Sequence, residues 1–205
     1  MTDTAPGTGG RRRGRPPRTE SAGTRERILD AAREEFAERG YEKTSVRGIA
    51  KAAGVDSALV HHYFGSKDDL FIAALEIPVD PRQVVPMVFA EGVEGAGERL
   101  MRMFLSVWED PEARLPLIAL VRASLGEAGP VNLLREGVLR MIFTPLREIL
   151  PGDDAEERVQ LVLSQLVGLV VARYVLAVEP LASMPPEDVV AWVAPTVQRY
   201  LDGDR

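Results

Sequence analysis

The chain has 205 residues, contains no cysteine and carries a formal net charge of −6 at pH 7. This length is enough for one or two domains with a sizeable buried core. The absence of cysteine excludes disulfides, thiolate metal sites and cysteine nucleophiles, and it fits a reducing compartment such as the cytosol. The N-terminal arginines are not followed by an apolar stretch, so we do not expect a signal peptide.

The charge is unevenly distributed along the chain. Residues 1–67 hold 13 Lys and Arg against 9 Asp and Glu, a balance of +4. Residues 68–205 hold 12 against 22, a balance of −10. This asymmetry predicts a basic module that meets nucleic acid and an acidic module that does not.

Residues 1–20 are poor in apolar side chains and rich in Gly, Pro, Thr and Arg, so we expect a disordered basic arm. Within the segment GRRRGRPPR, residues 10–18, an R-G-R-P sequence resembles the core of an AT-hook. Such a segment can enter the narrow minor groove of A·T-rich DNA, and Arg13 and Arg15 would contact the groove. The alternative is a solvated tail that only raises non-specific affinity.

A first helix is predicted from Thr24, its expected cap, to about Arg39, with Gly40 ending it. Its apolar stripe consists of Ile28, Ala32 and Phe36.

Residues 44–67 predict two short helices joined by a tight turn. Thr44 or Ser45 can cap the first helix through a side-chain oxygen, and Gly54 can end it in a left-handed conformation. Apolar residues recur between them at helical spacing, at Val46, Ile49, Ala50 and Ala53.

The second short helix is expected to begin after Asp56, with Val60 and Phe64 pointing inward. Ser66 and Asp69 have the spacing of a capping box for the helix that follows. Two short helices around a glycine turn form a helix-turn-helix, whose second helix enters the DNA major groove. The same pattern also occurs as a plain packing unit, so spacing alone leaves both readings open.

The flanking sequence favours DNA binding. The run VRGIAKAAGVDSALVHHYFGSKDDLF, residues 46–71, resembles the TetR (tetracycline-repressor-like) family of transcriptional regulators. The shared features are the glycine-valine turn, the H-Y-F-x-S-K segment and the D-L-F opening of the next helix, and residues 24–76 match without a gap. The resemblance implies an all-α protein with a helix-turn-helix domain over residues 21–76 and a helical regulatory and dimerisation domain over residues 77–205.

The resemblance also implies DNA contacts at ten positions, in addition to the two arm arginines. They are Thr44, Ser45, Arg47, Ser57, Ala58, Leu59, His61, His62, Tyr63 and Lys67. Leu59 stands where a small hydroxylated residue is usual in the family, and His61 stands where tyrosine is usual. These departures put the operator sequence in doubt rather than the mode of binding.

Beyond a boundary near residues 76–81, the sequence predicts only helices. Their approximate ranges are 82–90, 94–108, 111–127, 130–149, 155–178 and 186–201, separated by Pro and Gly clusters. Pro116 falls in a first turn, which tolerates proline, whereas Pro145 should kink or split its helix.

The segment 155–178 is apolar nearly all round, but Gln160, Gln165 and Arg173 within its apolar run argue against a membrane span. Such a helix needs a second partner, and in the TetR family the last two helices form the dimer interface. Val167 and Val170 are the positions expected there. Trp192 and Tyr200 are either interface anchors or core residues, and the sequence favours neither.

An effector cavity among the middle helices is also implied by the resemblance. Its candidate lining residues are Met103, Phe104, Trp108, Met141, Phe143, Gln165, Arg173 and Tyr174. We find no nucleotide-binding, nucleophile-elbow or metal-ligand motif, so neither a cofactor nor an enzymatic activity is expected.

The sequence thus predicts a cytoplasmic, nucleoid-associated homodimer that binds a palindromic DNA operator and responds to a small-molecule effector, most simply as a repressor. Three alternatives remain: an activator of the same family, an architectural protein of A·T-rich DNA, and a helical enzyme or carrier with a vestigial helix-turn-helix.

Overall fold

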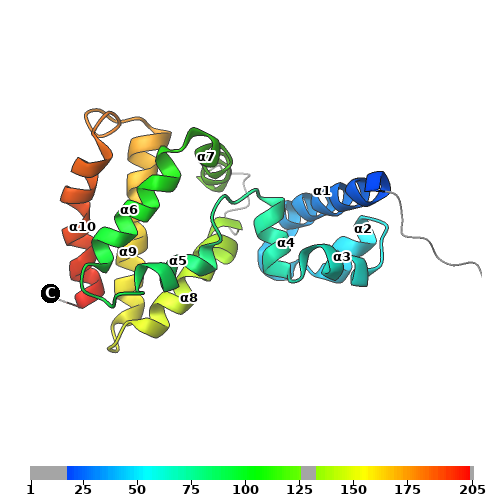
Figure 1. Cartoon of the computed structure of the whole chain (residues 1–205), viewed down its shortest axis with the longest axis horizontal. Coiled ribbons are helices and arrows are strands. Elements are labelled where there is room, and N and C mark those ends of the chain that lie inside the picture. The colour runs from blue at the N-terminus through cyan, green and yellow to red at the C-terminus, as the bar shows by residue number, and fades with distance from the viewer. Residues whose placement is uncertain (1–17, 126–132, 204–205) are drawn as a thin grey trace, which may run out of the picture.

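The computed structural model describes residues 18–125 and 133–203, and these residues form helices and loops without strands. The all-α prediction is therefore confirmed for the described part of the chain. Figure 1 shows two groups of helices joined end to end, which we call the N-terminal unit and the C-terminal unit.

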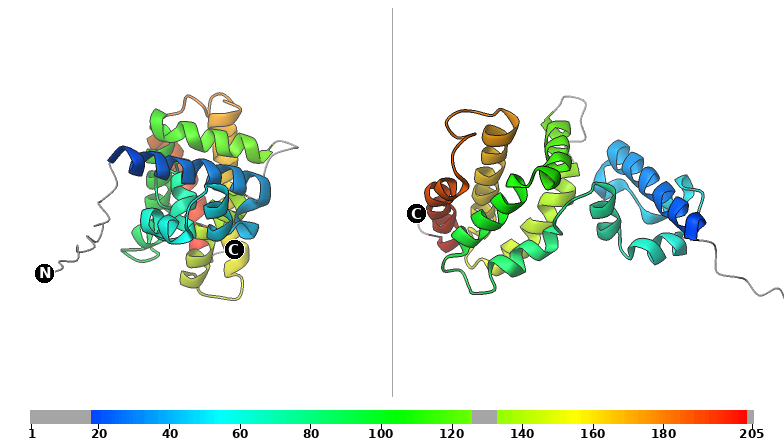
Figure 2. Two further views of the ribbon diagram at one scale, coloured as in Figure 1. Left: turned by 90° about the vertical axis from the view of Figure 1, so that its right-hand side faces the viewer. Right: turned by 45° about the horizontal axis from the view of Figure 1, so that its top comes forward.

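The N-terminal unit is built from α1 (Arg18–Lys43), α2 (Val46–Ala52), α3 (Ser57–Phe64) and α4 (Lys67–Ala74). The C-terminal unit begins with α5 (Pro81–Val88), α6 (Ala96–Glu109), α7 (Pro111–Leu125) and the π-helix η1 (Leu133–Leu139). It continues with α8 (Arg140–Ile149), α9 (Ala155–Val170), the π-helix η2 (Val171–Val175) and α10 (Pro186–Asp202). The right-hand view of Figure 2 shows the segment between α4 and α5 crossing from one unit to the other.

The first helix begins earlier than the sequence indicated. It starts at Arg18 rather than at Thr24, so residues 18–20 of the predicted arm are helical. Gly40 interrupts the helical geometry with a φ of 75°, and one further turn continues to Lys43. The remainder of the predicted arm, with Arg13 and Arg15, lies outside the described residues.

The apolar stripe of α1 forms the centre of the N-terminal core. Ile28, Ala32 and Phe36 have no exposed surface, and they pack with buried residues of α2, α3 and α4. Phe36 also meets the ring of Phe71 edge-on, with ring centroids 5.0 Å apart. These contacts hold the two short helices, which at seven and eight residues would not be stable alone.

Two helices of the C-terminal unit change their winding. In the described part of the predicted helix 130–149, the π-helix η1 is followed by α8, and α8 passes through Pro145. The predicted disruption therefore precedes the proline instead of falling at it. The predicted helix 155–178 ends at Val175, and its last five residues form η2. Single π turns are rare and often lie at functional sites.

A buried arginine joins α9 to the end of α10. The Arg158 guanidinium donates to the backbone carbonyls of Pro151 and Leu201, the latter at 3.1 Å, and forms an ion pair with Asp154 at 3.1 Å. It thereby satisfies carbonyl groups that the C-terminus of a helix leaves without partners.

The apolar face of α9 points into its own unit. Val170 is only 4% exposed and packs near Trp108 and Val121. This burial contradicts the expectation that Val170 faces a partner chain. Among the described residues, the continuous helix Ala155–Val175 is the one segment long and apolar enough to cross a bilayer, a property shared with core helices of soluble proteins.

Candidate nucleic-acid interface and internal cavity

Caps fix the two short helices of the N-terminal unit. The Ser45 hydroxyl accepts a hydrogen bond from the Gly48 amide at 3.1 Å, and the Asp56 carboxylate accepts one from the Ala58 amide at 2.7 Å. Gly54, with a φ of 67°, makes the left-handed turn between them. The predicted helix-turn-helix is confirmed in its bounds and in these caps.

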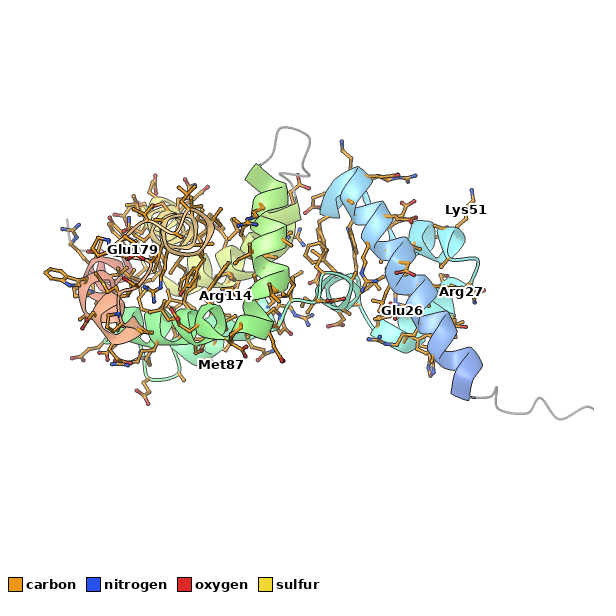
Figure 3. All side chains as sticks on the ribbon, turned by 90° about the horizontal axis from the view of Figure 1, so that it is seen from above. Glu26, Arg27, Lys51, Met87, Arg114 and Glu179 are labelled. Carbon is orange, nitrogen blue, oxygen red and sulfur yellow. The ribbon has the colours of Figure 1, made fainter. Side chains whose placement is uncertain are left out.

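The packing of α3 leaves one of its faces open. Val60 and Phe64 are buried against α1 and its neighbours, as predicted. The other side chains of α3 are exposed or half-buried: Ser57, Ala58, Leu59, His61, His62 and Tyr63. Arg47 is exposed on α2. Figure 3 shows Lys51, also on α2, at the outer edge of this unit. The structure therefore brings most of the predicted contacts onto one accessible part of the molecule.

The two histidines of α3 have different surroundings. Nδ1 of His61 lies 2.8 Å from the carbonyl oxygen of Gly65, so this nitrogen donates a hydrogen bond and Nε2 is left for another partner. The His62 ring meets the ring of Tyr63 at a centroid distance of 5.6 Å. His61 is thus held by the backbone, whereas His62 rests on an aromatic neighbour.

Thr44 does not share this accessible surface. Its side chain is 3% exposed, and its hydroxyl lies 2.7 Å from the Gly40 carbonyl oxygen and 2.9 Å from that of Glu35. This burial removes the Thr44 side chain from the candidate contacts. Its hydroxyl instead fastens the end of α1 to the start of α2.

Lys67 begins α4 beside an aromatic ring. Its ammonium lies 4.1 Å from the centre of the Tyr41 ring and 3.5 Å from the carbonyl oxygen of Glu42. Partial burial lowers the pKa of Lys67, and the nearby Glu42 carboxylate acts in the opposite direction. The guanidinium of Arg140, from α8, lies 5.1 Å from the same ring. Lys67 of the N-terminal unit and Arg140 of the C-terminal unit therefore both lie near the Tyr41 ring.

The start of α4 is also fixed by a capping box. Ser66 accepts from the Asp69 amide at 3.1 Å, and the Asp69 carboxylate accepts from the Ser66 amide at 3.0 Å. Arg82 of the C-terminal unit donates to the same carboxylate at 2.6 Å. The hydrogen bond from the Ser66 hydroxyl, followed by that from Arg82, lowers the pKa of Asp69.

The C-terminal unit contains an apolar cavity of about 180 Å³. Side chains from α5, α6, α7, η1, α8 and α9 surround it, and none of them is charged. Three of the eight predicted lining residues are among them: Met103, Phe104 and Trp108.

The other five predicted lining residues lie elsewhere. Met141 packs into the core of the N-terminal unit, and Phe143 packs partly buried against the C-terminal core without bordering the cavity. Gln165 is half-buried on α9 and also does not border it. Arg173 and Tyr174 belong to a separate polar cluster. The helical pattern of the sequence identified apolar faces, but it could not tell which of them leave space between one another.

This polar cluster is centred on Glu109. Arg173, only 5% exposed, donates to the Glu109 carboxylate at 2.7 Å and to the Leu181 carbonyl, and the Tyr174 hydroxyl donates to the same carboxylate at 2.8 Å. Burial opposes ionisation of Glu109, but the bonds from Arg173 and Tyr174 outweigh it and lower the Glu109 pKa. Burial, followed by the Glu109 contact, raises the pKa of Tyr174 to about 12.

Residues that the sequence did not single out complete the cavity wall, and two of them border the N-terminal unit as well. Leu120 of α7 and Val138 of η1 line the cavity and also pack against the core of the N-terminal unit. No local motif marks such a role, because it depends on the angle at which the two units meet.

The outer surface of the last two helices carries exposed apolar side chains. Leu161 on α9 is 44% exposed and Trp192 on α10 is 77% exposed, which excludes a core role for Trp192. Tyr200 packs partly buried against the C-terminal core. Within the described residues, no group of three or more His, Asp or Glu side chains is placed to hold a metal ion.

Two models of known protein families match this chain, one in each unit. The model "Tetracyclin repressor-like, C-terminal domain" matches residues 94–201, and the model "Bacterial regulatory proteins, tetR family" matches residues 28–74.

Curated relatives match over the N-terminal part. The HTH-type transcriptional repressor AcnR of Corynebacterium glutamicum is 34% identical over 89 residues, which cover 43% of this chain and 43% of AcnR. The HTH-type transcriptional regulator HbdR of Aromatoleum sp. is 34% identical over 85 residues, which cover 41% of this chain and 35% of HbdR. The chain thus spans less than half the length of the curated relatives it matches.

Solved structures match over nearly the whole chain. A TetR-family regulator from Streptomyces coelicolor A3 is 40% identical, with a TM-score of 0.55, and the match covers 94% of this chain and 99% of that one. NalD of Pseudomonas aeruginosa, at 21% identity and a TM-score of 0.50 over 92% of this chain and all of NalD, shares the fold. This chain belongs to the TetR family of transcriptional regulators.

Proposed function

We propose that the protein is a cytoplasmic, sequence-specific transcriptional repressor that binds a near-palindromic DNA operator as a homodimer and responds to a small-molecule effector. The observation that carries the proposal is the accessible face of α3, held by a capped turn and offering hydroxyl, imidazole and apolar groups next to one another. Such a mixture suits base edges in the major groove, where donors, acceptors and thymine methyl groups are all presented.

In this proposal α3 reads bases while its neighbours hold phosphates. Leu59 would meet a thymine methyl group, and His62 and Tyr63 would reach base edges. Ser45, Arg47 and Lys67 stand at the starts of α2 and α4, where phosphate contacts fix orientation without reading sequence.

A dimer would place two copies of α3 in successive major grooves, about 34–36 Å apart. We assign the dimer contact to the outer face of α9 and α10, which includes the exposed Leu161, Gly168 and Trp192. Apart from its chain neighbours and the backbone of its own helix, no heavy atom of the protomer lies within 4 Å of a Cβ built on Gly168, so a second backbone has room to approach there. An exposed tryptophan is a frequent anchor of such interfaces.

The basic arm remains part of the proposal, although residues 1–17 lie outside the described part of the chain. If Arg13 and Arg15 reach the minor groove, deletion of residues 1–17 should reduce the salt dependence of operator binding. The slope of log affinity against log salt should fall by roughly 0.9 for each phosphate that the shortened protein no longer neutralises. An unchanged slope would show that the arm does not touch DNA.

A second candidate is an activator of the same family. The HTH-type transcriptional activator FasR of Mycolicibacterium smegmatis is 40% identical over 75 residues, which cover 37% of this chain and 33% of FasR. The two candidates share the DNA-binding surface and differ in what binding does to transcription.

A gel-shift assay on the DNA upstream of the protein's own gene, in excess competitor DNA, tests DNA binding. The native protein should shift this DNA, and the double variant Leu59→Ala, Tyr63→Ala should lose specific binding while melting as the native protein does. Retention of the shift by the double variant would contradict the role of α3. In vitro transcription from the same DNA then separates repression from activation.

A further inference from the structure

The cavity in the C-terminal unit is lined entirely by apolar side chains. Its walls are formed by 25 residues, all of them Val, Leu, Ile, Met, Phe, Pro or Trp. The indole nitrogen of Trp108 is the only side-chain nitrogen or oxygen atom in this set.

Four charged groups on the helices around the cavity are engaged elsewhere. Arg82 of α5 binds Asp69 and Asp80, with closest contacts of 2.6 and 2.7 Å. Arg99 of α6 donates to the Val88 carbonyl at 2.7 Å.

Arg140 and Glu109 are the other two of these groups. Arg140 of α8 pairs with Glu42 of α1 at 2.7 Å. Beyond Trp108, whose ring lies 5.3 Å from that of Tyr174, the Glu109 carboxylate is occupied by Arg173 and Tyr174. Because none of the lining side chains is charged, an ion that entered the cavity would lose hydration without gaining a charged partner, and this change is costly in an apolar interior.

The size of the cavity sets the scale of its occupant. An apolar cavity of roughly 150 Å³ remains dry and binds benzene-sized molecules. The cavity in this protein is slightly larger, at about 180 Å³, and α6 contributes Met103, Phe104 and Trp108 to its lining. Aromatic rings and a thioether adapt well to flat or flexible hydrocarbon surfaces.

We propose that the effector is an uncharged, hydrocarbon-like molecule of about the size of a substituted benzene, bound without an ionic anchor. The inference rests on the proposed function only in treating the cavity as the effector site. Binding itself is measurable without DNA, so the two ideas fail separately. If the protein binds operator DNA but none of the neutral probes, only the proposed ligand class is rejected. If it binds the neutral probes but no operator DNA, the proposed function is rejected.

The chain provides its own reporter for this experiment. It contains two tryptophans, and Trp108 lines the cavity whereas Trp192 is exposed on α10. The variant Trp192→Phe, which keeps an aromatic ring at the proposed dimer contact, leaves Trp108 as the only tryptophan. Toluene, benzoate and benzylammonium then form a matched series that differs mainly in charge, and 1-hexanol adds a linear neutral probe.

We expect saturable changes in Trp108 emission with toluene and 1-hexanol, and dissociation constants at least tenfold higher for benzoate and benzylammonium. Equal or tighter binding of either ion would overturn the proposal, as would the absence of any response to both neutral probes. A response to only one neutral probe would support the proposal and would select a flat or a linear ligand.

Two variants on α5 locate the binding. Val84 is half-buried and lines the cavity, whereas Met87 is 52% exposed and does not line it (Figure 3). Val84→Phe should weaken toluene binding at least tenfold, and Met87→Phe should leave it unchanged. If Val84→Phe does not fold, Val167→Phe fills the same cavity from a different helix, α9. Toluene binding that survives in the folded cavity-filling variant would place the ligand elsewhere and contradict the proposal.

Discussion

Gly137 of η1 lies directly against the ring of Phe71 of α4. A Cβ built on Gly137 would come within 2.2 Å of Cζ of Phe71, a separation that real Cβ atoms essentially never show. Phe71 is fully buried in the core of the N-terminal unit. The two units therefore meet at a point where only glycine fits.

The same segment borders the cavity. Val138 and Leu139 follow Gly137 and line the cavity, and Arg140 pairs with Glu42 of α1. A ligand that displaces this segment would act at once on the contact with Phe71 and on the ion pair. We therefore expect η1 to carry the effector response from the cavity to the N-terminal unit.

The first prediction concerns Gly137→Ala. The added methyl group should push η1 away from Phe71, at a cost of about 1–3 kcal/mol in the free energy of unfolding, as in other overpacked cores. When no effector is present, this variant should bind the operator more weakly than the native protein does, because the angle between the units changes. Thermal unfolding and DNA titration measure the two effects.

The matched control is Gly23→Ala on α1, where no heavy atom outside its chain neighbours and the backbone of its own helix lies within 4 Å of the new Cβ. It should stabilise the protein slightly, because alanine favours helix more than glycine does. If Gly137→Ala binds operator and responds to effector as the native protein does, η1 is not the coupling element.

The second prediction concerns dimerisation, and it uses Leu161 because Val167 and Val170, the two positions expected at the dimer interface, both line the cavity instead. Leu161→Arg would bury an unpaired charge in each copy, so the dimer should weaken by roughly two orders of magnitude or more. Met87→Arg, at an exposed position of α5, should leave the dimer intact. Analytical ultracentrifugation distinguishes the two variants, and a native-like dimer of Leu161→Arg would move the interface away from this face.

The third prediction concerns Lys67. Lys67→Ala should weaken binding to all operator variants by a similar factor and reduce the salt slope by about 0.9, because a phosphate contact carries no sequence information. Arg147→Ala on α8, in the C-terminal unit, is the control and should leave the slope unchanged. A weakening confined to one base position would mean that Lys67 reads a base.

The fourth prediction concerns pH and Asp69. The bonds from Ser66 and Arg82 lower the pKa of Asp69 below its ordinary value of 3.8, so the folded state favours the charged carboxylate. The stabilisation is therefore complete above the unfolded pKa and is lost as pH falls through the lower folded pKa.

Asp69→Asn should consequently cost about 0.5–2 kcal/mol at pH 7, the usual range for removal of a cap. The difference from the native protein should stay constant down to about pH 5 and shrink below about pH 4. Urea unfolding at several pH values measures it. A difference that persists undiminished at low pH would show that the carboxylate charge is not what stabilises the cap.

Much of the N-terminal unit was predictable because its signals are local. Ser45, Asp56 and Ser66 cap the helices that follow them, and each is recognisable from the sequence within one turn. The cap expected of Thr24 failed because α1 continues upstream to Arg18, through a segment that contains Gly23 but no proline. The prediction that Thr44 contacts DNA was wrong because a hydroxyl near a helix start can turn inward as readily as outward.

The cavity was harder to predict because it depends on distances between helices. Trp108 and Tyr174 are neighbours, yet only Trp108 faces the empty space, since Glu109 holds the Tyr174 hydroxyl. Met141 followed the expected apolar pattern but packs across the boundary into the N-terminal core. Helical periodicity gives the direction of a side chain and not the identity of the surface opposite it.

The central claim is that two copies of α3 read one palindromic operator. Hydroxyl-radical footprinting of the native protein on the DNA upstream of its own gene tests this claim most directly. The account predicts two protected half-sites related by two-fold symmetry and centred about one helical turn apart, 34–36 Å. Uniform protection that follows only A·T content, or a single unpaired half-site at saturating protein, would contradict it.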